Sequence, residues 1–292
     1  MTTPATWTVR TLLGWSAPWL ERRGVASPRL DSELLLAKAL DLRRIDLFMD
    51  PHRPLTAPEL AAFKALLTRR AAREPVAHLL GVREFWGLEF YSSRAALIPR
   101  PETELLLETV LASFADRQAP LEMFEPCVGS GAVLCALLHE YPGATGVGSD
   151  LSAEALELAR RNATKSGCGD RVTLLEGDLD TPLPADARFD VVVINPPYIV
   201  SGDLPGLQPE VRDWEPRLAL DGGGDGLQVL RRLPGLLQAR VRPGGVAVIE
   251  IGDDQGETVM GLFQSAGFEQ VELLLDYHRS PRAVVIRTRQ SS

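Results

Sequence analysis

The chain has 292 residues, of which 45% are hydrophobic and 24% are charged, and its formal net charge at pH 7 is -8. These values are typical of an ordinary globular protein with room for one large domain and one small domain, which excludes a disordered or fibrous chain. Three cysteines without a Cys-x-x-Cys pair indicate neither a disulfide framework nor a zinc site, so we expect no metal.

The sequence shows no signal segment and no apolar run of membrane-spanning length, so we expect a cytoplasmic protein without a membrane partner. Its negative charge is unevenly distributed. Residues 1–95 carry more Lys and Arg than Asp and Glu, whereas residues 96–292 are strongly acidic. An acidic body argues against dominant nucleic-acid binding, although the basic segment could meet an acidic partner or RNA.

Residues 1–82 are expected to form a small helical bundle. The segments 29–37 and 60–67 carry apolar residues at spacings of three and four, which is typical of helices with one buried face. Thr56 is placed to cap the second of these helices. Because no catalytic constellation occurs here, we interpret this part as a lid or as a module that docks a partner.

A linker is expected over residues 83–98. Its aromatic-rich stretch at 84–91 predicts a short β-hairpin. Pro99 and Pro101 then bracket an arginine before a helix expected over 104–115, and Pro101 suits the first turn of that helix. This block is equally compatible with a rigid linker and with a role in shaping the mouth of a pocket.

From residue 121 onward, strands alternate with helices, which is the signature of an α/β fold with a doubly wound parallel sheet. We assign residues 99–292 to this domain. The strands are expected at 121–126, 144–149, 171–176, 189–194, 246–251, 270–275 and 283–287, and the helices at 132–140, 152–166, 225–240 and 257–266.

The strand at 189–194 ends in the motif Asn195-Pro196-Pro197-Tyr198. Proline donates no N–H to a sheet and holds the preceding residue extended, so Asn195 is fixed at the carboxyl end of the strand, where open α/β sheets bind ligands. The Asn195 side-chain oxygen and the Pro196 carbonyl would each accept one N–H of a planar –NH2 group, and Tyr198 would stack on it. We therefore predict substrate binding by all four residues, with Asn195, Pro196 and Tyr198 catalytic. A proline-terminated strand followed by a surface loop is the alternative.

A turn rich in small residues precedes this motif. Gly129 and Gly131 permit a tight strand-to-helix turn and close approach of a ligand, but the third glycine of a dinucleotide fingerprint and the lysine of a phosphate loop are missing. Asp150 closes the second strand, where its carboxylate can bind both ribose hydroxyls, although such an aspartate is as often the N-terminal residue of a helix. After the third strand, Asp178 can accept from an adenine amine while Leu179 covers the ring. In this order, before the Asn-Pro-Pro-Tyr motif, these residues indicate S-adenosylmethionine.

These motifs resemble the protein-(glutamine-N5) methyltransferase family, which modifies class I peptide-chain release factors. The similar stretches run from about residue 28 to the C-terminus and include 30–36, 73–81, 84–88, 97–104, 195–199 and 242–245. The Pro-Arg-Pro-Glu-Thr-Glu block at 99–104 and the N-terminal stretches are specific to this family. The Asn-Pro-Pro-Tyr motif also occurs in amino-methyltransferases that act on DNA and RNA.

The resemblance implies a Rossmann-like, S-adenosylmethionine-dependent methyltransferase domain. It implies methyl transfer to the side-chain amide nitrogen of the glutamine in a Gly-Gly-Gln loop, with Asn195 and Pro196 binding that amide and the N-terminal helices docking the release factor. We expect a monomer. The cofactor site is expected to consist of Glu125, Cys127, Val128, Gly129, Ser130, Gly131, Asp150, Leu151, Asp178, Leu179 and Asn195.

The first turn departs from the family pattern Asp-x-Gly-x-Gly-x-Gly. Glu125 replaces the aspartate and can keep its carboxylate role, whereas Cys127 adds a Cβ where glycine is usual. This turn is also similar to the Asp-Pro-x-x-Gly-Ser-Gly turn of DNA amino-methyltransferases. Amino-methylation of adenine or cytosine in DNA or RNA is therefore the alternative activity, and a non-catalytic binding module that keeps the fold is a third interpretation.

Overall fold

The structure, a computed structural model, describes residues 6–289 and divides into two units. The smaller unit ends at Gly81 and also includes the distant segment Gln208–Trp214, whereas Val82–Leu207 and the described residues from Glu215 onward form the larger unit. The helices of the smaller unit are α1 (Val9–Glu21), α2 (Pro28–Leu40), α3 (Asp46–Met49), α4 (Ala57–Ala71), α5 (Val76–Leu80) and α9 (Pro209–Arg212).

The helical unit has its own core, in which leucines of α1 and α2 pack with Phe63 of α4. The segment Gln208–Trp214 lies in a loop that the sequence places within the methyltransferase domain. It belongs to the helical unit, and its Glu210 forms ion pairs with Arg70 and Arg73 of that unit.

The predicted hairpin forms from β1 (Val82–Phe85) and β2 (Leu88–Tyr91), which pair in antiparallel fashion. Trp86 and Gly87 both have positive φ, as a two-residue hairpin turn of type I′ requires. Phe85 and Phe90 are buried in the core of the larger unit. The hairpin is therefore part of that unit rather than a separate linker.

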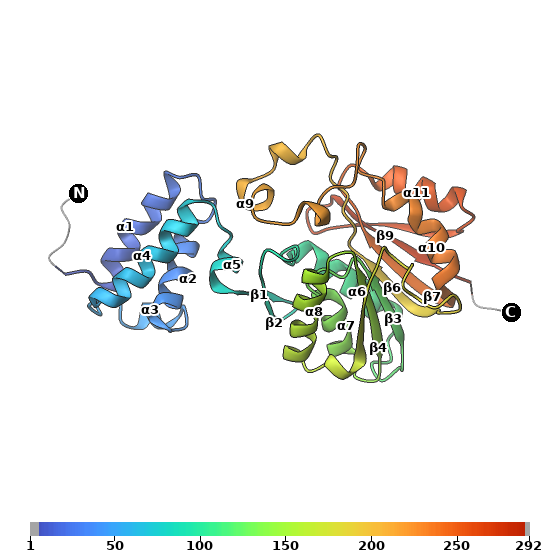
Figure 1. Cartoon of the computed structure of the whole chain (residues 1–292), viewed down its shortest axis with the longest axis horizontal. Helices are drawn as coiled ribbons and strands as arrows, with labels where there is room; N and C mark the ends of the chain where they lie inside the picture. The colour runs from blue at the N-terminus through green and yellow to red at the C-terminus, as the bar shows by residue number, and fades with distance from the viewer. Residues whose placement is uncertain (1–5, 290–292) are drawn as a thin grey trace. The chain divides into compact units, whose positions relative to one another are not determined.

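The larger unit contains a seven-stranded sheet in the order β5-β4-β3-β6-β7-β9-β8 (Figure 1). Neighbouring strands from β5 to β7 run parallel, but β9 is antiparallel to both of its neighbours. The sheet is thus mixed, because residues 276–280 between β8 and β9 are too few for a crossover connection. The strands are β3 (Glu122–Pro126), β4 (Thr145–Asp150), β5 (Val172–Glu176), β6 (Phe189–Ile194), β7 (Val241–Glu250), β8 (Gln270–Leu275) and β9 (Pro281–Arg287).

Helices cover both faces of this sheet. In β6, Val191 and Val193 face the core formed with α6, α7 and α8, whereas Val192 and Ile194 face the core formed with α10 and α11. This burial on both faces explains the uninterrupted apolar run in the sequence. The helices are α6 (Glu104–Ser113), α7 (Ala132–Glu140), α8 (Ala153–Lys165), α10 (Leu233–Arg240) and α11 (Gly256–Ser265), with short 3₁₀ turns η1 (Pro101–Thr103), η2 (Gly169–Arg171), η3 (Leu204–Gly206), η4 (Arg217–Ala219) and η5 (Leu230–Arg232).

The helix predicted over 225–240 is shorter than expected. Residues 225–229 form a loop, because Asp225 accepts the Leu227 N–H with its side chain and Gly226 adopts a positive φ. Among residues 6–289, no helix has the length and apolar character needed to cross a membrane.

Candidate active site

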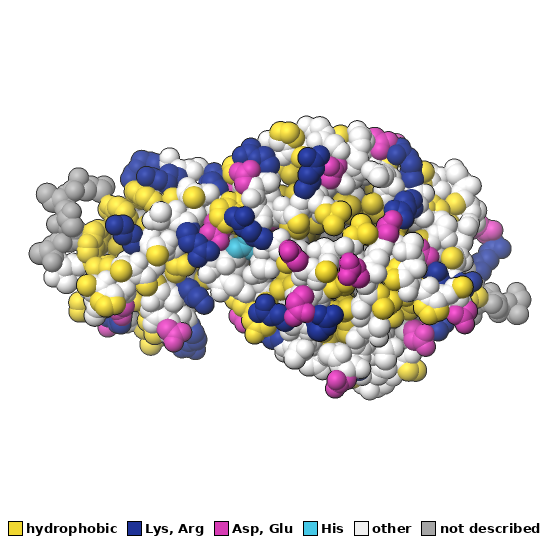
Figure 2. All heavy atoms as spheres, in the orientation of Figure 1, with side chains coloured by type: hydrophobic (Ala, Val, Ile, Leu, Met, Phe, Trp, Pro, Cys, Tyr) yellow, Lys and Arg dark blue, Asp and Glu magenta, His cyan; other side chains and the backbone are white. Residues whose placement is uncertain are grey.

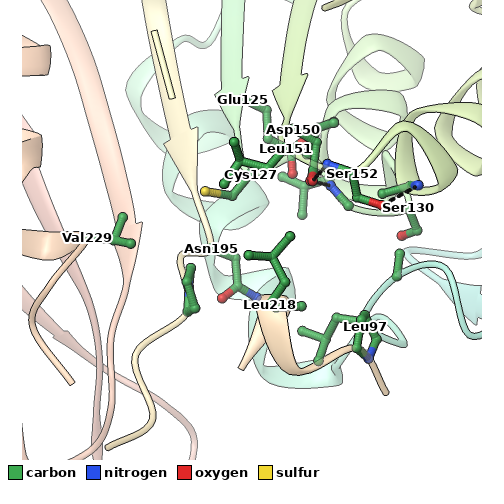
Figure 3. A pocket seen from close by; sticks show the side chains of 18 of the residues that line it. Leu97, Glu125, Cys127, Ser130, Asp150, Leu151, Ser152, Asn195, Leu218 and Val229 are labelled. Carbon is green, nitrogen blue, oxygen red and sulfur yellow. Dashed lines mark hydrogen bonds between the residues drawn. The ribbon is translucent and has the colours of Figure 1, made fainter. Parts of the chain in front are cut away.

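A cavity of about 470 Å³ opens at the carboxyl ends of β3 to β6 in the larger unit (Figure 3). This volume lies in the range of small-molecule sites, about 300–1,000 Å³. The predicted residues that line it are Glu125, Cys127, Val128, Gly129, Ser130, Asp150, Leu151, Asp178, Leu179, Asn195 and Pro197. The other predicted site residues, Gly131, Pro196 and Tyr198, are not among those that line the cavity.

The glycine turn, residues 127–131, joins β3 to α7. Cys127, Gly129 and Gly131 all have positive φ. Gly131 also lacks room for a side chain, since a Cβ there would lie 3.1 Å from the Ala159 Cβ. The turn therefore requires glycine at 131, although this residue does not itself line the cavity.

Among the residues of this turn with positive φ, Cys127 is the one that is not glycine, and a left-handed conformation costs such a residue about 1–2 kcal/mol. Its side chain extends from the turn toward the part of the cavity where Asn195 lies (Figure 3). Burial, together with the negative charges of Asp150, Asp178 and Glu125, raises the pKa of the Cys127 thiol to about 12. The sulfur is therefore a protonated, weakly polar surface of the site.

Asp150, the last residue of β4, is held by two backbone N–H groups. Its Oδ2 accepts from Gly129 at 2.9 Å, and its Oδ1 accepts from Ser152 at 2.9 Å. Each carboxylate oxygen has a further lone pair, so Asp150 can still accept bonds from hydroxyl groups in the cavity. Leu151 beside it is 53% exposed and adds an apolar surface to the cavity.

Glu125, on β3, is almost completely buried, and its Oε2 accepts the Leu134 N–H at 2.8 Å in the first turn of α7. Burial raises the pKa of this carboxyl well above its usual value, and the charge of Asp150 raises it further. Glu125 thus holds the start of α7 and keeps a carboxyl oxygen at the cavity wall.

Asp178 and Leu179 follow β5. The Asp178 carboxylate pairs with the Arg232 guanidinium, with N–O distances of 2.8 and 3.1 Å. Leu179 has a positive φ, and its carbonyl accepts from the Ser149 hydroxyl, which fixes its side chain in the cavity wall. Sequence reasoning missed Arg232, since it placed that residue in the middle of a helix.

Asn195 belongs to a hydrogen-bonded chain of side chains, here named the Asn195 network. Its Nδ2 donates to Thr103 Oγ1 at 3.4 Å, and Thr103 Oγ1 donates to Glu250 Oε2 at 2.6 Å. Tyr198 donates its hydroxyl to Glu250 Oε1 at 3.3 Å. Within residues 6–289 no hydrogen bond reaches the Pro196 carbonyl, which leaves this acceptor available.

The sequence analysis did not place Thr103 and Glu250 beside Asn195. The only signal for Thr103 was its place in the Pro-Arg-Pro-Glu-Thr-Glu block. Glu250 is the last residue of β7, and the register that sets Ile194 opposite Ile249 makes it a neighbour of Asn195. Tyr198 has the structural role of a donor to this carboxylate, and burial raises the pKa of its phenol.

The proline-bracketed block forms one wall of the cavity. Arg100 Nη2 pairs with Glu215 Oε1 at 2.6 Å, and Glu215 also accepts the Ile98 N–H at 3.3 Å. Leu97, Pro99 and Thr103 line the cavity, and Figure 3 shows Leu97 and Leu218 on the side opposite Asp150. This arrangement favours the pocket-mouth interpretation of the block.

Comparison with known folds places the larger unit among the methyltransferases. A methyltransferase domain model matches residues 124–213. The catalytic domain of hMettl16 in complex with MAT2A 3'UTR hairpin 6 has a TM-score of 0.59 at 15% identity, covering 82% of this chain and 86% of that one. The T. Thermophilus 16S rRNA N2 G1207 methyltransferase has a TM-score of 0.52 at 19% identity, covering 71% and 50%. The fold and the site therefore define a Rossmann-like α/β methyltransferase.

The sequence comparisons identify the family. The model for the PrmC N-terminal domain matches residues 11–81. The chain is 45% identical over 265 residues to the release factor glutamine methyltransferase of Geobacter sulfurreducens, covering 91% of each chain. It is 40% identical over 287 residues to that of Moorella thermoacetica, covering 97% of this chain and 99% of the relative. The chain belongs to the release factor glutamine methyltransferase family, which confirms the resemblance noted in the sequence.

Proposed function

We propose that this enzyme transfers a methyl group from S-adenosylmethionine to the side-chain amide nitrogen of the glutamine in the Gly-Gly-Gln loop of class I release factors. The observation that supports this most directly is the position of Asn195 on the cavity wall at the carboxyl end of β6. Membership of the family supports the same substrate class.

The cavity fits S-adenosylmethionine in its chemistry. Carboxyl groups of Glu125, Asp150 and Asp178 lie at three adjacent strand ends, where they complement hydroxyl, amine and cationic groups. Leu151 and Leu179 offer apolar surfaces for a planar ring, and a Cβ at the neighbouring Gly129 would meet no atom closer than 3.8 Å. We propose that these residues hold the cofactor, together with Cys127, Val128 and Ser130 in the wall and Gly131 shaping the turn.

When bound, S-adenosylmethionine supplies a methyl group on a positively charged sulfur. The protein has to orient an amide nitrogen, which is a poor nucleophile because its lone pair is delocalised. Asn195 Oδ1 and the Pro196 carbonyl would accept its two N–H groups and hold the planar amide in one orientation. Orientation of this kind lowers a barrier by up to ~7–11 kcal/mol in favourable cases.

No side chain is assigned as a general base, since the proton can leave after the nitrogen has been methylated. Pro197 in the cavity wall would limit how the amide tilts. Tyr198 does not line the cavity, and its hydroxyl is bound to Glu250. Tyr198 would therefore act indirectly, by holding the Glu250 carboxylate.

We propose that the helical unit docks the release factor, that the enzyme acts as a monomer in the cytoplasm, and that it forms no stable complex with nucleic acid. In the view of Figure 2, the Lys and Arg side chains of the helical unit are scattered among hydrophobic and acidic ones. A continuous basic patch would be expected for binding to a phosphate backbone.

The Asn195→Ala variant tests the catalytic assignment. Loss of one acceptor should lower kcat on a Gly-Gly-Gln release factor roughly 100-fold, while cofactor affinity changes little. Methylation can be measured by mass spectrometry of the glutamine peptide, and cofactor binding by calorimetry. Near-normal turnover in this variant would remove the proposed role of Asn195.

The Asp150→Ala variant tests the cofactor site, as Asn195→Ala tests the substrate site. It should weaken cofactor binding first, because Asp150 holds the glycine turn and faces the cavity. DNA and RNA are included as substrates in the same assay. Methyl label only in nucleic acid would overturn the proposed substrate, and a wild-type protein that binds neither the cofactor nor its demethylated product would support the binding-module interpretation.

A further inference from the structure

The Asn195 network contains two buried side chains with no assigned role in this chemistry. Thr103 is 3% exposed and Glu250 is 2% exposed. They come from different elements, η1 and the end of β7. Thr103 contacts the Asn195 carboxamide directly, and Glu250 contacts it through Thr103. A buried polar group of this kind needs a hydrogen-bonding partner, so the direction of each bond in the network matters.

The direction of these bonds follows from counting hydrogen atoms. A threonine hydroxyl has one hydrogen to donate, and an ionised carboxylate can only accept. Thr103 therefore donates to Glu250 and has only lone pairs left for Asn195. The side of the carboxamide that faces Thr103 must then be its NH2 group, so Oδ1 is directed away from Thr103.

We propose that Glu250 and Thr103 are positioning residues that fix the Asn195 carboxamide with its oxygen available to the substrate amide. This inference rests on the proposed function. A flipped carboxamide would present an NH2 group to the substrate NH2 group, so one acceptor would be lost and two donors would face each other. The carboxamide alone has no preference between the two orientations, and the network supplies one.

The network depends on the charge of Glu250. If Glu250 is protonated, it can donate to Thr103, and Thr103 can then donate to Asn195, which permits the flipped carboxamide. The groups that face Glu250 are Arg282 from β9, Tyr198, and Thr103 and Glu102 from η1. Burial raises the pKa of Glu250, with a smaller contribution from Glu102, whereas Thr103, Arg282 and Tyr198 oppose this rise.

The first test removes the Thr103 hydroxyl. Thr103→Val should lower kcat about 10- to 100-fold with little change in cofactor affinity, and Thr103→Ser should restore most of it. Thr109→Val is the matched control, because Thr109 is also buried and its hydroxyl donates only within α6, to Leu105 at 2.7 Å. A Thr103→Val enzyme with the kcat of Thr109→Val would overturn the proposal.

The second test uses pH. The ionised form of Glu250 is the active one, so kcat should fall as pH drops through its pKa, and Glu250→Gln should lose this acidic limb. Nuclear magnetic resonance of the ¹⁵N-labelled Asn195 side chain gives a readout independent of activity, and its signal should titrate with the same pKa in the wild type only. An unchanged acidic limb or an unchanged titration in Glu250→Gln would contradict the proposal.

The same assays separate this inference from the proposed function. If the wild type fails to methylate a release factor, or Asn195→Ala retains turnover, the proposed function fails. If Asn195→Ala loses turnover while Thr103→Val and Glu250→Gln behave like the wild type, only the positioning role fails.

Discussion

Cys127 stands in the glycine turn at the position where the family pattern has glycine. Its φ of 60° is the conformation expected of glycine at this point, and Gly129 and Gly131 adopt similar values. The left-handed turn is therefore kept at a cost in backbone strain. What the substitution adds is a thiol in the cavity wall, surrounded by carboxyl groups.

We expect the Cys127 thiol to be unreactive in the native enzyme. Because burial and the neighbouring carboxylates raise its pKa to about 12, the thiolate that reacts with alkylating agents is scarce near neutral pH. Iodoacetamide at pH 7.5, followed by mass spectrometry, should modify Cys127 at least ~100-fold more slowly than it modifies the urea-unfolded chain. Rapid alkylation of Cys127 in the folded protein would contradict this environment.

At the scale of residues, the position of a side chain can be predicted from the sequence where the residue lies next to a recognisable strand. Asp150 and Asn195 could be placed because Asp150 ends β4 and Asn195 directly follows β6, and the carboxyl ends of parallel strands meet at one edge of the sheet. Glu250 and Arg232 could not be placed, because their partners are distant in sequence and no local pattern distinguishes them. Only the folded chain brings such pairs together.

At the scale of elements, the residues that begin helix α4 can be recognised from the sequence alone. The Thr56 N–H donates to Glu59 Oε2 at 2.8 Å, and Glu59 also pairs with Arg53 at 2.5 Å. With Pro58 next to this start, the capping box fixes where the helix begins. These hydrogen bonds, the one from the Thr56 backbone most of all, lower the pKa of Glu59 to about 2.

Thr56→Ala should lower the free energy of unfolding of the helical unit by about 1 kcal/mol, since the cap is lost. The contribution of the Glu59 carboxylate to the free energy of unfolding depends on pH. The folded-state pKa lies below the usual 4.5, so this stability is present above pH ~4.5 and is lost as pH falls toward 2. Denaturation curves of Glu59→Gln should lack this loss, whereas Glu21→Gln, which changes an exposed carboxylate of α1, should retain it. An equal acid response in both variants would exclude the cap as its source.

Element boundaries were predictable where local chemistry decides them and failed where tertiary contacts do. The strand at 189–194 and the helix at 132–140 have the predicted bounds. The predicted start of α10 was wrong, because Asp225 and Gly226 form a turn ahead of it. The antiparallel β9 was also not predicted, since periodicity does not report strand direction.

At the scale of the whole molecule, the chain is organised as two units that are not two continuous stretches. Residues 208–214 leave the methyltransferase domain, join the helical unit and return at Glu215. Their attachment is an ion-pair cluster in which Arg70 binds both Asp31 and Glu210, and Arg73 binds Glu210 through two nitrogens. Composition and periodicity gave no sign of it, because the cluster joins positions more than 130 residues apart.

Glu210 should be the residue that holds this segment to the helical unit. Burial opposes its ionisation, but hydrogen bonds from Arg73 and Arg70 outweigh that effect and hold the pKa of Glu210 below its usual value. The ionised form is thus the one that stabilises the fold, and its contribution should disappear as the pH falls through this lowered pKa.

Glu210→Gln should therefore loosen the segment at neutral pH. We expect its opening free energy to fall by about 2 kcal/mol, which corresponds to roughly 30-fold faster hydrogen exchange over residues 208–214. Asp213→Asn is the matched control in the same segment, because its ion pair with Arg212 is exposed and such pairs contribute little. Exchange measured by mass spectrometry should rise in the first variant and stay near wild type in the second. Equal exchange in the two variants would mean that the segment is held by its other contacts and not by the ion pairs of Glu210.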